Sequence, residues 1–227
     1  MANILITGAN RGIGLELTKQ YVQAGHHAHA CCRNPDGADA LHALAGDHVT
    51  IHELIPTDAA SVAALAANIT SIDILINNAG AKGPEPDQQS GLSMDFESWL
   101  ETFNVNTLAP LRVVQALHSA LKKGTDAKAI TITSQMGSLD LNWPVMYAYS
   151  SSKAAVNKVM RMLSLELVKD NIAVGLIHPG YVQTDMGGPN AEITATESAK
   201  GIMSVIDGIS TNNTGCFMKW NGESHNW

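Results

Sequence analysis

A tyrosine and a lysine stand four positions apart in this chain, at Tyr149 and Lys153, in a segment whose flanks read as helix. Positions i and i+4 lie on one face of an α-helix, so the phenol and the ammonium project into the same space. A nearby cation lowers the pKa of a tyrosine from its usual value of about 10. The spacing therefore predicts a tyrosine that exchanges a proton with a substrate oxygen. Two surface side chains that merely share a helix face are the alternative.

A glycine-rich turn near the N-terminus predicts a nucleotide site. The apolar residues 3–6 read as a strand, and Thr7 to Gly14 follow with the spacing Gly-x-x-x-Gly-x-Gly before an amphipathic helix. Glycines allow a tight turn and the close approach of a pyrophosphate, and the helix N-terminus offers N–H groups and a positive dipole end. An ordinary turn between a strand and a helix is the alternative for this segment alone.

The Tyr149–Lys153 pair, the glycine-rich turn and four further motifs together resemble those of the short-chain dehydrogenase/reductase family. The further motifs are Asn-Asn-Ala-Gly at residues 77–80, Asn106 in a predicted helix, Ser134 at the end of a predicted strand, and Pro-Gly-x-x-x-Thr at residues 179–184. The six motifs stand in the family's order. Residues 32–35 and 183–188 look most like its C-factor and sniffer-type carbonyl reductase branch.

The resemblance implies an α/β Rossmann fold, a doubly wound parallel sheet with strand order 3-2-1-4-5-6-7. The alternation of apolar runs with helical stretches agrees with it. The length suits one domain, so residues 1–227 are expected to form a single NADP(H)-binding Rossmann domain that carries the catalytic site. We expect strands at 3–7, 27–32, 48–54, 72–77, 129–134, 172–178 and 215–219, and helices at 12–24, 36–45, 59–69, 94–122, 147–169 and 196–209.

The resemblance further implies hydride transfer between a nicotinamide cofactor and a small carbonyl or alcohol substrate. Tyr149 would donate the proton and Ser134 would bind the carbonyl oxygen. Lys153 would lower the Tyr149 pKa and bind the nicotinamide ribose, and Asn106 would hold a water linking Lys153 to solvent. A cofactor-binding sensor or signalling protein with little turnover is the alternative. The residues expected to bind the cofactor are Gly8, Asn10, Arg11, Gly12, Ile13, Gly14, Arg33, Asn78, Ala79, Gly80, Tyr149, Lys153, Pro179, Gly180, Val182 and Thr184.

The residues after the second predicted strand favour NADP(H) over NAD(H). An acidic residue there would hold the ribose 2′-hydroxyl of NAD, but none precedes Asp36. Arg33 and Arg11 can instead offer guanidinium groups to a 2′-phosphate. Two solvated surface arginines are the alternative.

Two positions depart from the family pattern. Ile55 stands where an Asp usually contacts the adenine, and the nearby Asp58 is expected to cap the following helix. The interval from Ser134 to Tyr149 is long, at 15 residues, which leaves Ser138 as a rival for the catalytic serine.

Composition excludes several classes of partner. A net charge of −7 gives no basic footprint for nucleic acid or an anionic membrane, and no apolar run is long enough to span a bilayer. The chain enters its first strand without the features of a signal peptide, and three cysteines make no disulfide framework, so a cytoplasmic protein is expected. His27, His29 and Cys31 alternate on one strand, but a sheet covered on both faces argues against a metal site there.

An apolar band on the helix after Tyr149 favours a homodimer. Its positions follow helical periodicity, and the band is wider than packing against one sheet requires. The band consists of Val156, Val159, Met160, Leu163 and Leu167.

Overall fold

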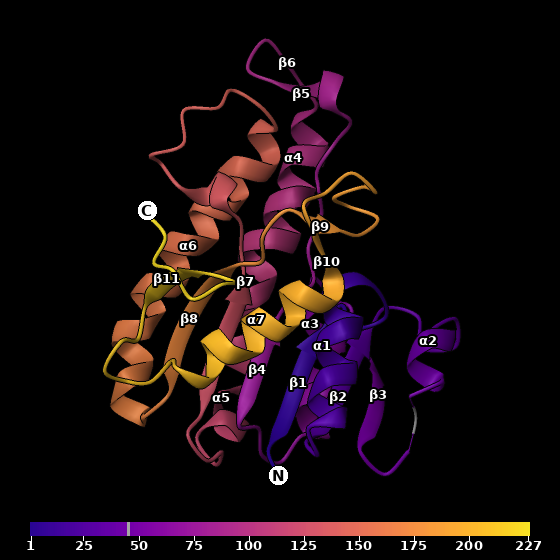
Figure 1. Ribbon diagram of the computed structural model, residues 1–227. Coiled ribbons are helices and arrows are strands. Elements are labelled where there is room, and N and C mark those ends of the chain that lie inside the picture. The colour runs from indigo at the N-terminus through magenta and orange to yellow at the C-terminus, as the bar shows by residue number, and fades with distance from the viewer. Residues whose placement is uncertain (45) are drawn as a thin grey trace.

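A seven-stranded parallel sheet runs through the computed structural model, which describes residues 1–44 and 46–227 (Figure 1). The strand order is β11-β8-β7-β4-β1-β2-β3. In chain order of the sheet strands this is 3-2-1-4-5-6-7, so the predicted doubly wound sheet is confirmed. Its strands are β1 (Asn3–Thr7), β2 (His27–Cys32), β3 (Val49–Glu53), β4 (Ile74–Asn77), β7 (Lys128–Ile132), β8 (Ala173–His178) and β11 (Cys216–Lys219).

Helices cover both faces of the sheet, namely α1 (Gly12–Gln23), α3 (Ala59–Ala67), α5 (Ala109–Leu121), α6 (Tyr147–Leu167) and α7 (Ala195–Asp207). The helices α1 and α7 lie side by side in front of the sheet in Figure 1 and bury Leu17 and Ile202 against it. The helices α3, α5 and α6 bury Val62, Val113 and Met160 against the other face. Coverage on both sides explains why β1, β4 and β8 are nearly continuous apolar runs.

The single helix expected at 94–122 is wrong in detail. The structure has α4 (Phe96–Phe103), a π-helical segment (Asn104–Leu108) and then α5. Pro110 has no N–H to donate, and its ring clashes with the carbonyl four positions earlier, which is that of Asn106. The helix therefore widens at that turn, and this places Asn106 where the regular helix would not.

Several loops carry short elements that the sequence did not predict. The helix expected at 36–45 is reduced to α2 (Asp39–His42), and Ala45 lies outside the described residues. The loop at 82–93 holds a 3-10 turn (Pro86–Gln88) and the hairpin of β5 (Gln89–Ser90) and β6 (Ser93–Met94). The segment after β8 is pinned by the pairing of β9 (Val182–Gln183) with β10 (Ile193–Thr194). Two more 3-10 turns are Gln135–Gly137 and Val168–Asp170.

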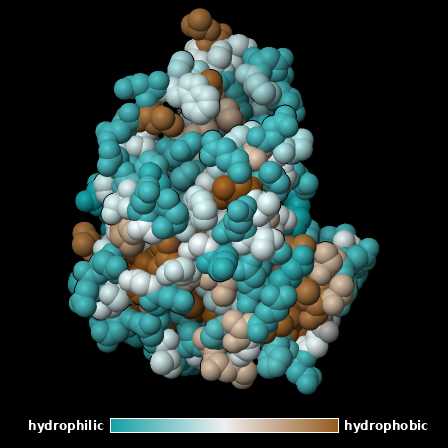
Figure 2. Space-filling view, viewed as in Figure 1, coloured by the Kyte–Doolittle hydropathy of each residue, from teal (hydrophilic) through white to brown (hydrophobic). Residues whose placement is uncertain are grey.

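The apolar band on α6 packs against the chain's own core. Val156, Met160 and Leu167 are buried there, and Leu163 packs beside them. Four of the five positions of the band therefore face the chain's own core, and the homodimer stays a prediction. The face of the molecule in Figure 2 is mostly hydrophilic, with apolar side chains in separate small groups. Within the described residues, no helix is both long and apolar enough to cross a bilayer.

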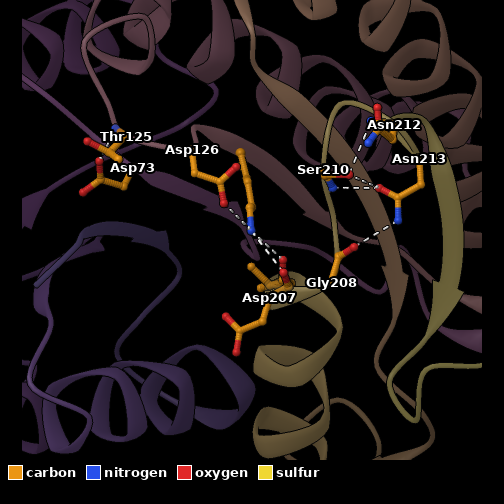
Figure 3. Close-up of polar contacts among 10 residues, drawn as sticks. Asp73, Thr125, Asp126, Asp207, Gly208, Ser210, Asn212 and Asn213 are labelled. Atoms are coloured by element: carbon orange, nitrogen blue, oxygen red, sulfur yellow. Dashed lines mark hydrogen bonds and ion pairs between the residues drawn. The ribbon is translucent and has the colours of Figure 1, made fainter.

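The edge of the sheet opposite the carboxyl ends is held by polar contacts around the buried Lys128 and the half-buried Asp73 (Figure 3). The Nζ of the buried Lys128 donates to the carbonyl oxygen of Ile206 at 3.0 Å and lies 3.1 Å from an oxygen of Asp126. A cation at the C-terminus of α7 complements the helix dipole. The Asp73 carboxylate accepts from the backbone N–H groups of Asn3 and Thr125. These contacts join α7 and the loops to the sheet away from the catalytic edge.

Candidate active site

The expected catalytic residues converge at the carboxyl edge of the sheet from three different elements. Asn106 comes from the π-helical segment and Ser134 follows β7, while Tyr149 and Lys153 lie in the first two turns of α6. Gly80, just beyond β4, lies among them, because a Cβ built on it would stand 3.3 Å from Asn106 Oδ1 and 3.7 Å from Lys153 Nζ. A side chain at position 80 would fill this space.

The Ser134 side chain, as a hydrogen-bonding neighbour, lowers the pKa of the Tyr149 phenol. Burial acts in the opposite direction and is the larger effect, so the pKa of Tyr149 is raised above its ordinary value. The phenol therefore stays protonated at neutral pH. Ser138, the rival serine, instead accepts from the backbone N–H of Asp140 at 3.3 Å, and no hydrogen bond joins its described side chain to Tyr149.

Lys153 is buried, and its Nζ donates to the carbonyl oxygen of Ile132 at 3.0 Å, at the end of β7. The Nζ lies 5.7 Å from the centre of the Tyr149 ring. Burial lowers the pKa of Lys153 to about 8, because desolvation disfavours its charged form. The expectation that the pKa of Tyr149 lies below its ordinary value is thus wrong, because burial raises it. Burial dominates both groups.

The Asn106 side chain is held in place by hydrogen bonds of its amide group. Its Oδ1 accepts from the N–H of Ala81 at 2.8 Å, and its Nδ2 donates to the carbonyl of Ala81 at 2.8 Å and to Ser152 Oγ at 3.0 Å. These bonds tie the π-helical segment to the residue after the Asn-Asn-Ala-Gly motif and to α6. The side chain therefore fixes the distance between three parts of the site.

The N-terminal half of α6 is locked against the end of β7. A Cβ on Gly137 would stand 2.8 Å from the Lys153 backbone and 2.8 Å from Asn157 Nδ2, so only glycine fits there. Thr133 Oγ1 donates to Asn157 Oδ1 at 2.6 Å, and Asn157 Nδ2 donates to the Gly137 carbonyl at 3.2 Å. This packing holds Lys153 close to the strand end that carries Ser134.

The glycine-rich turn after β1 is shaped by the end of β4. Gly8 has a φ of +64°, which favours glycine, and a Cβ on Gly14 would stand 2.3 Å from the Gly8 carbonyl oxygen. Thr7 Oγ1 accepts from the N–H groups of Asn78 and Ala79, at 3.0 Å each. Asn78 Nδ2 donates to the carbonyl of Gly8 at 3.1 Å. The turn opens onto the N-terminus of α1, a site suited to a pyrophosphate.

The segment after β8 closes the other side of this turn. A Cβ on Gly12 would stand 3.2 Å from Thr184 Cγ2, and Gly180 has a φ of +90°. Val182 is buried, and the carbonyl of Pro179 accepts from Ser198 Oγ at 2.7 Å. The structure therefore brings the predicted Pro-Gly-x-x-x-Thr motif to the glycine-rich turn.

Arg11 and Arg33 differ in their surroundings. Arg33 follows β2 and is exposed. Arg11 Nη1 pairs instead with Asp185 Oδ2 at 2.8 Å, a contact that sequence reasoning missed because the two residues lie far apart in the chain. Ile55 is half-buried after β3, and Asp58 accepts from the N–H of Ala60, so the predicted helix cap is confirmed.

The histidines on β2 and β3 form a pair rather than a ligand set. His29 Nδ1 lies 3.0 Å from His52 Nε2, and His27 Nε2 lies 3.0 Å from Thr50 Oγ1. Over residues 1–44 and 46–227 no group of three or more His, Cys, Asp or Glu side chains is placed to hold a metal ion.

A family model described as short chain dehydrogenase matches residues 2–195. The chain belongs to this family. This short-chain dehydrogenase is 39% identical to the C-signal protein of Myxococcus xanthus over 172 residues, which cover 72% of this chain and 99% of that protein. The structure of the carbonyl reductase Sniffer of D. melanogaster superimposes with a TM-score of 0.94 at 30% identity and covers all of both chains. The NADPH-bound carbonyl reductase from chicken fatty liver gives a TM-score of 0.92 at 31% identity, covering 100% of this chain and 99% of that one. The resemblance to sniffer-type reductases that the motifs indicated is thereby confirmed.

Proposed function

We propose that this short-chain dehydrogenase is an NADP(H)-dependent carbonyl reductase, with cofactor site and catalytic site in one domain spanning residues 1–227. The observation that carries the proposal is the convergence of Ser134, Tyr149 and Lys153 at one edge of the sheet, with the buried Lys153 Nζ 5.7 Å from the centre of the Tyr149 ring. This group stands at the same sheet edge as the glycine-rich turn. The resemblance to solved carbonyl reductases over the whole chain supports the assignment.

The residues around the glycine-rich turn fit a dinucleotide. A Cβ on Gly8 would crowd Ala79 and a Cβ on Gly14 would collide with the Gly8 carbonyl, so glycines keep the turn tight, and the N-terminus of α1 faces it. Residues 8–14 would hold the pyrophosphate, and Thr184 with the Pro179–Gly180 turn would hold the nicotinamide end. When bound, the reduced nicotinamide would supply a hydride to a carbonyl carbon.

Tyr149 would donate its phenolic proton to the carbonyl oxygen as that oxygen gains negative charge. A raised pKa suits this direction, because the group is protonated at neutral pH before the reaction. The Ser134 hydroxyl would donate a hydrogen bond to the same oxygen and stabilise its charge. Lys153 would bind the ribose through its Nζ. Asn106, which is hydrogen-bonded to Ala81 and Ser152, would hold the neighbouring Lys153 in position.

The choice of NADP(H) rests on charge at the adenosine end. Arg33 is exposed directly after β2, and no acidic residue precedes Asp36 to hold a ribose 2′-hydroxyl. Arg11 stands at the N-terminus of α1 and is the second guanidinium available to a 2′-phosphate. Two of the similar solved structures are bound to NADPH or NADP, which supports the same choice here.

A second candidate is a signalling protein of this fold with little turnover, favoured by the likeness to the protein named C-signal. Consumption of NADPH, followed by its absorbance, against a panel of ketones, quinones and aldehydes separates the two. The reductase turns over at least one class with NADPH and much more slowly with NADH. Tight NADPH binding without turnover on any of the panel would favour the signalling protein.

A further inference from the structure

Gln89 is buried at the base of the hairpin formed by β5 and β6, although the tip of that hairpin is fully open to solvent. Its residual exposure is 2%, whereas Leu92 at the tip is fully exposed. Its Nε2 donates to the carbonyl of Pro84 at 2.6 Å, and its Oε1 accepts from the backbone N–H of Tyr149 at 3.3 Å. One buried amide thus joins the loop at 82–94 to the start of α6.

The start of α6 needs such a partner. The residue before the helix, Met146, is left-handed with a φ of 51°, and it makes no side-chain capping bond. Tyr149 is the third residue of the helix, a position whose N–H has no partner inside the helix. Helices usually satisfy this donor with an adjacent Ser, Thr, Asp or Asn. Here the acceptor comes from a residue 60 positions earlier in the chain.

The Gln89 amide is tightly enclosed. A Cβ on Gly83 would stand 3.3 Å from Gln89 Oε1 and 3.3 Å from Thr102 Oγ1, and Gly83 has a φ of +90° that favours glycine. The same Cβ would stand 3.4 Å from Ala148 Cβ, in the first turn of α6. The amide is therefore buried where the loop, α4 and α6 meet.

We propose that Gln89 is a positioning residue for the catalytic tyrosine. Its Oε1 holds the backbone of Tyr149, while its Nε2 holds the loop that borders the site. Both the placement of the phenol and the shape of the substrate side of the site then depend on one side chain. This inference rests on the proposed function, because it assigns Tyr149 as the proton donor.

Two isosteric variants separate the two ends of the amide. Gln89→Met removes both the donor and the acceptor, whereas Gln89→Glu keeps an acceptor for the Tyr149 N–H but loses the donor to Pro84. A carboxylate is also favoured at a helix N-terminus. Displacement of a catalytic group by about 1 Å costs up to about 10²-fold, so we expect Gln89→Met to lower kcat about tenfold or more. We expect Gln89→Glu to keep kcat within about threefold and to raise KM, because its loop is released.

Thr102→Val is the matched control, since Thr102 lines the same enclosure and bonds only to the Ser98 carbonyl among the described residues. It should leave kcat unchanged, and NADPH affinity, measured by fluorescence, should stay near wild type in all three variants. An unchanged kcat in Gln89→Met overturns the inference, as does an equal fall in kcat for the Met and Glu variants. If Gln89→Met does not fold, Gln89→Glu decides alone, by a raised KM with kcat kept.

Tyr149→Phe is run in parallel: full activity in that variant would refute the proposed function itself, whereas full activity in Gln89→Met alone would refute only the role of Gln89.

Discussion

Arg11 Nη1 lies 2.8 Å from Asp185 Oδ2, which joins the glycine-rich turn to the segment that follows Thr184. Both side chains are largely exposed, at 65% and 74%. The guanidinium proposed to bind a 2′-phosphate is therefore paired with a carboxylate of the same chain. Cofactor and Asp185 would compete for Arg11, and the competition is weak because exposed ion pairs contribute little.

Asp185→Asn should tighten NADPH binding. The variant removes both the competitor and a negative charge near the phosphate, and an exposed pair is worth about 0.2–1 kcal/mol, or up to about fivefold in Kd. NADH has no 2′-phosphate, so its affinity should change less. Fluorescence titration with both cofactors at low and moderate salt measures this. An equal change for NADH and NADPH would show that Asp185 acts on the loop rather than on Arg11.

Tyr149→Phe should abolish most turnover while leaving cofactor affinity nearly unchanged. Loss of a general acid costs about 10²–10⁴-fold in rate, whereas the phenol hydroxyl contributes little to holding the dinucleotide. Lys153→Ala is the informative companion, because it should impair both turnover and NADPH binding. Single-turnover kinetics and fluorescence titration measure the two effects. A Phe variant that kept more than about a tenth of wild-type turnover would remove Tyr149 from the mechanism.

Arg33→Asp should shift cofactor preference toward NADH. The variant removes a charge-assisted contact worth about 1.5–3 kcal/mol and places a like charge beside the phosphate, so a shift of about tenfold or more in the kcat/KM ratio is expected. The control is Lys19→Asp, which makes the change from a cation to an aspartate on α1, away from the adenosine end. Equal use of NADH and NADPH by the wild-type enzyme would contradict the roles of Arg11 and Arg33.

Thr7→Val should destabilise the fold by about 2–4 kcal/mol, because it leaves the N–H groups of Asn78 and Ala79 without their acceptor. Thr131→Val is a matched control on β7. Its hydroxyl is equally buried but lacks a hydrogen-bond partner within the described part of the chain. That variant should be neutral or stabilising. Chemical denaturation measures both, and equal effects would mean that the Thr7 hydroxyl does not stabilise the turn.

Stability should fall as the pH drops from about 6.5 to about 4. Burial, followed by the charges of His225 and Lys219, lowers the pKa of His178 to about 4, and burial, followed by His52 and His27, lowers that of His29 to about 4. The unfolded chain then binds more protons than the folded one in this range, so stability is complete above it and is lost on acidification. His178→Gln should reduce the loss by about 1–3 kcal/mol. An unchanged pH dependence of unfolding in that variant would show that His178 does not titrate differently on folding.

The order of the strands followed from the resemblance to the family. The sequence by itself determined the alternation of strands with helices, the glycine-rich turn and the cap on α3. Each depends on residues that are close in the chain: apolar runs alternating with helices, glycines at fixed spacing beside Thr7, and Asp58 two residues before Ala60. The four-residue interval from Tyr149 to Lys153 likewise sets their common helix face. Pro110 carried a further local signal, since a proline four residues after Asn106 disturbs a helix.

Only the tertiary structure decided what surrounds these residues. Burial, which depends on packing of distant segments, raises the pKa of Tyr149 and lowers that of Lys153, against the expectation from their spacing. Three sets of contacts join segments 25 to 174 positions apart: the hydrogen bonds of Asn106, the bond of Gln89 to Tyr149, and the ion pair of Arg11 with Asp185. No local pattern marks such contacts, because a side-chain amide or carboxylate has the same appearance in the sequence whatever it meets in space.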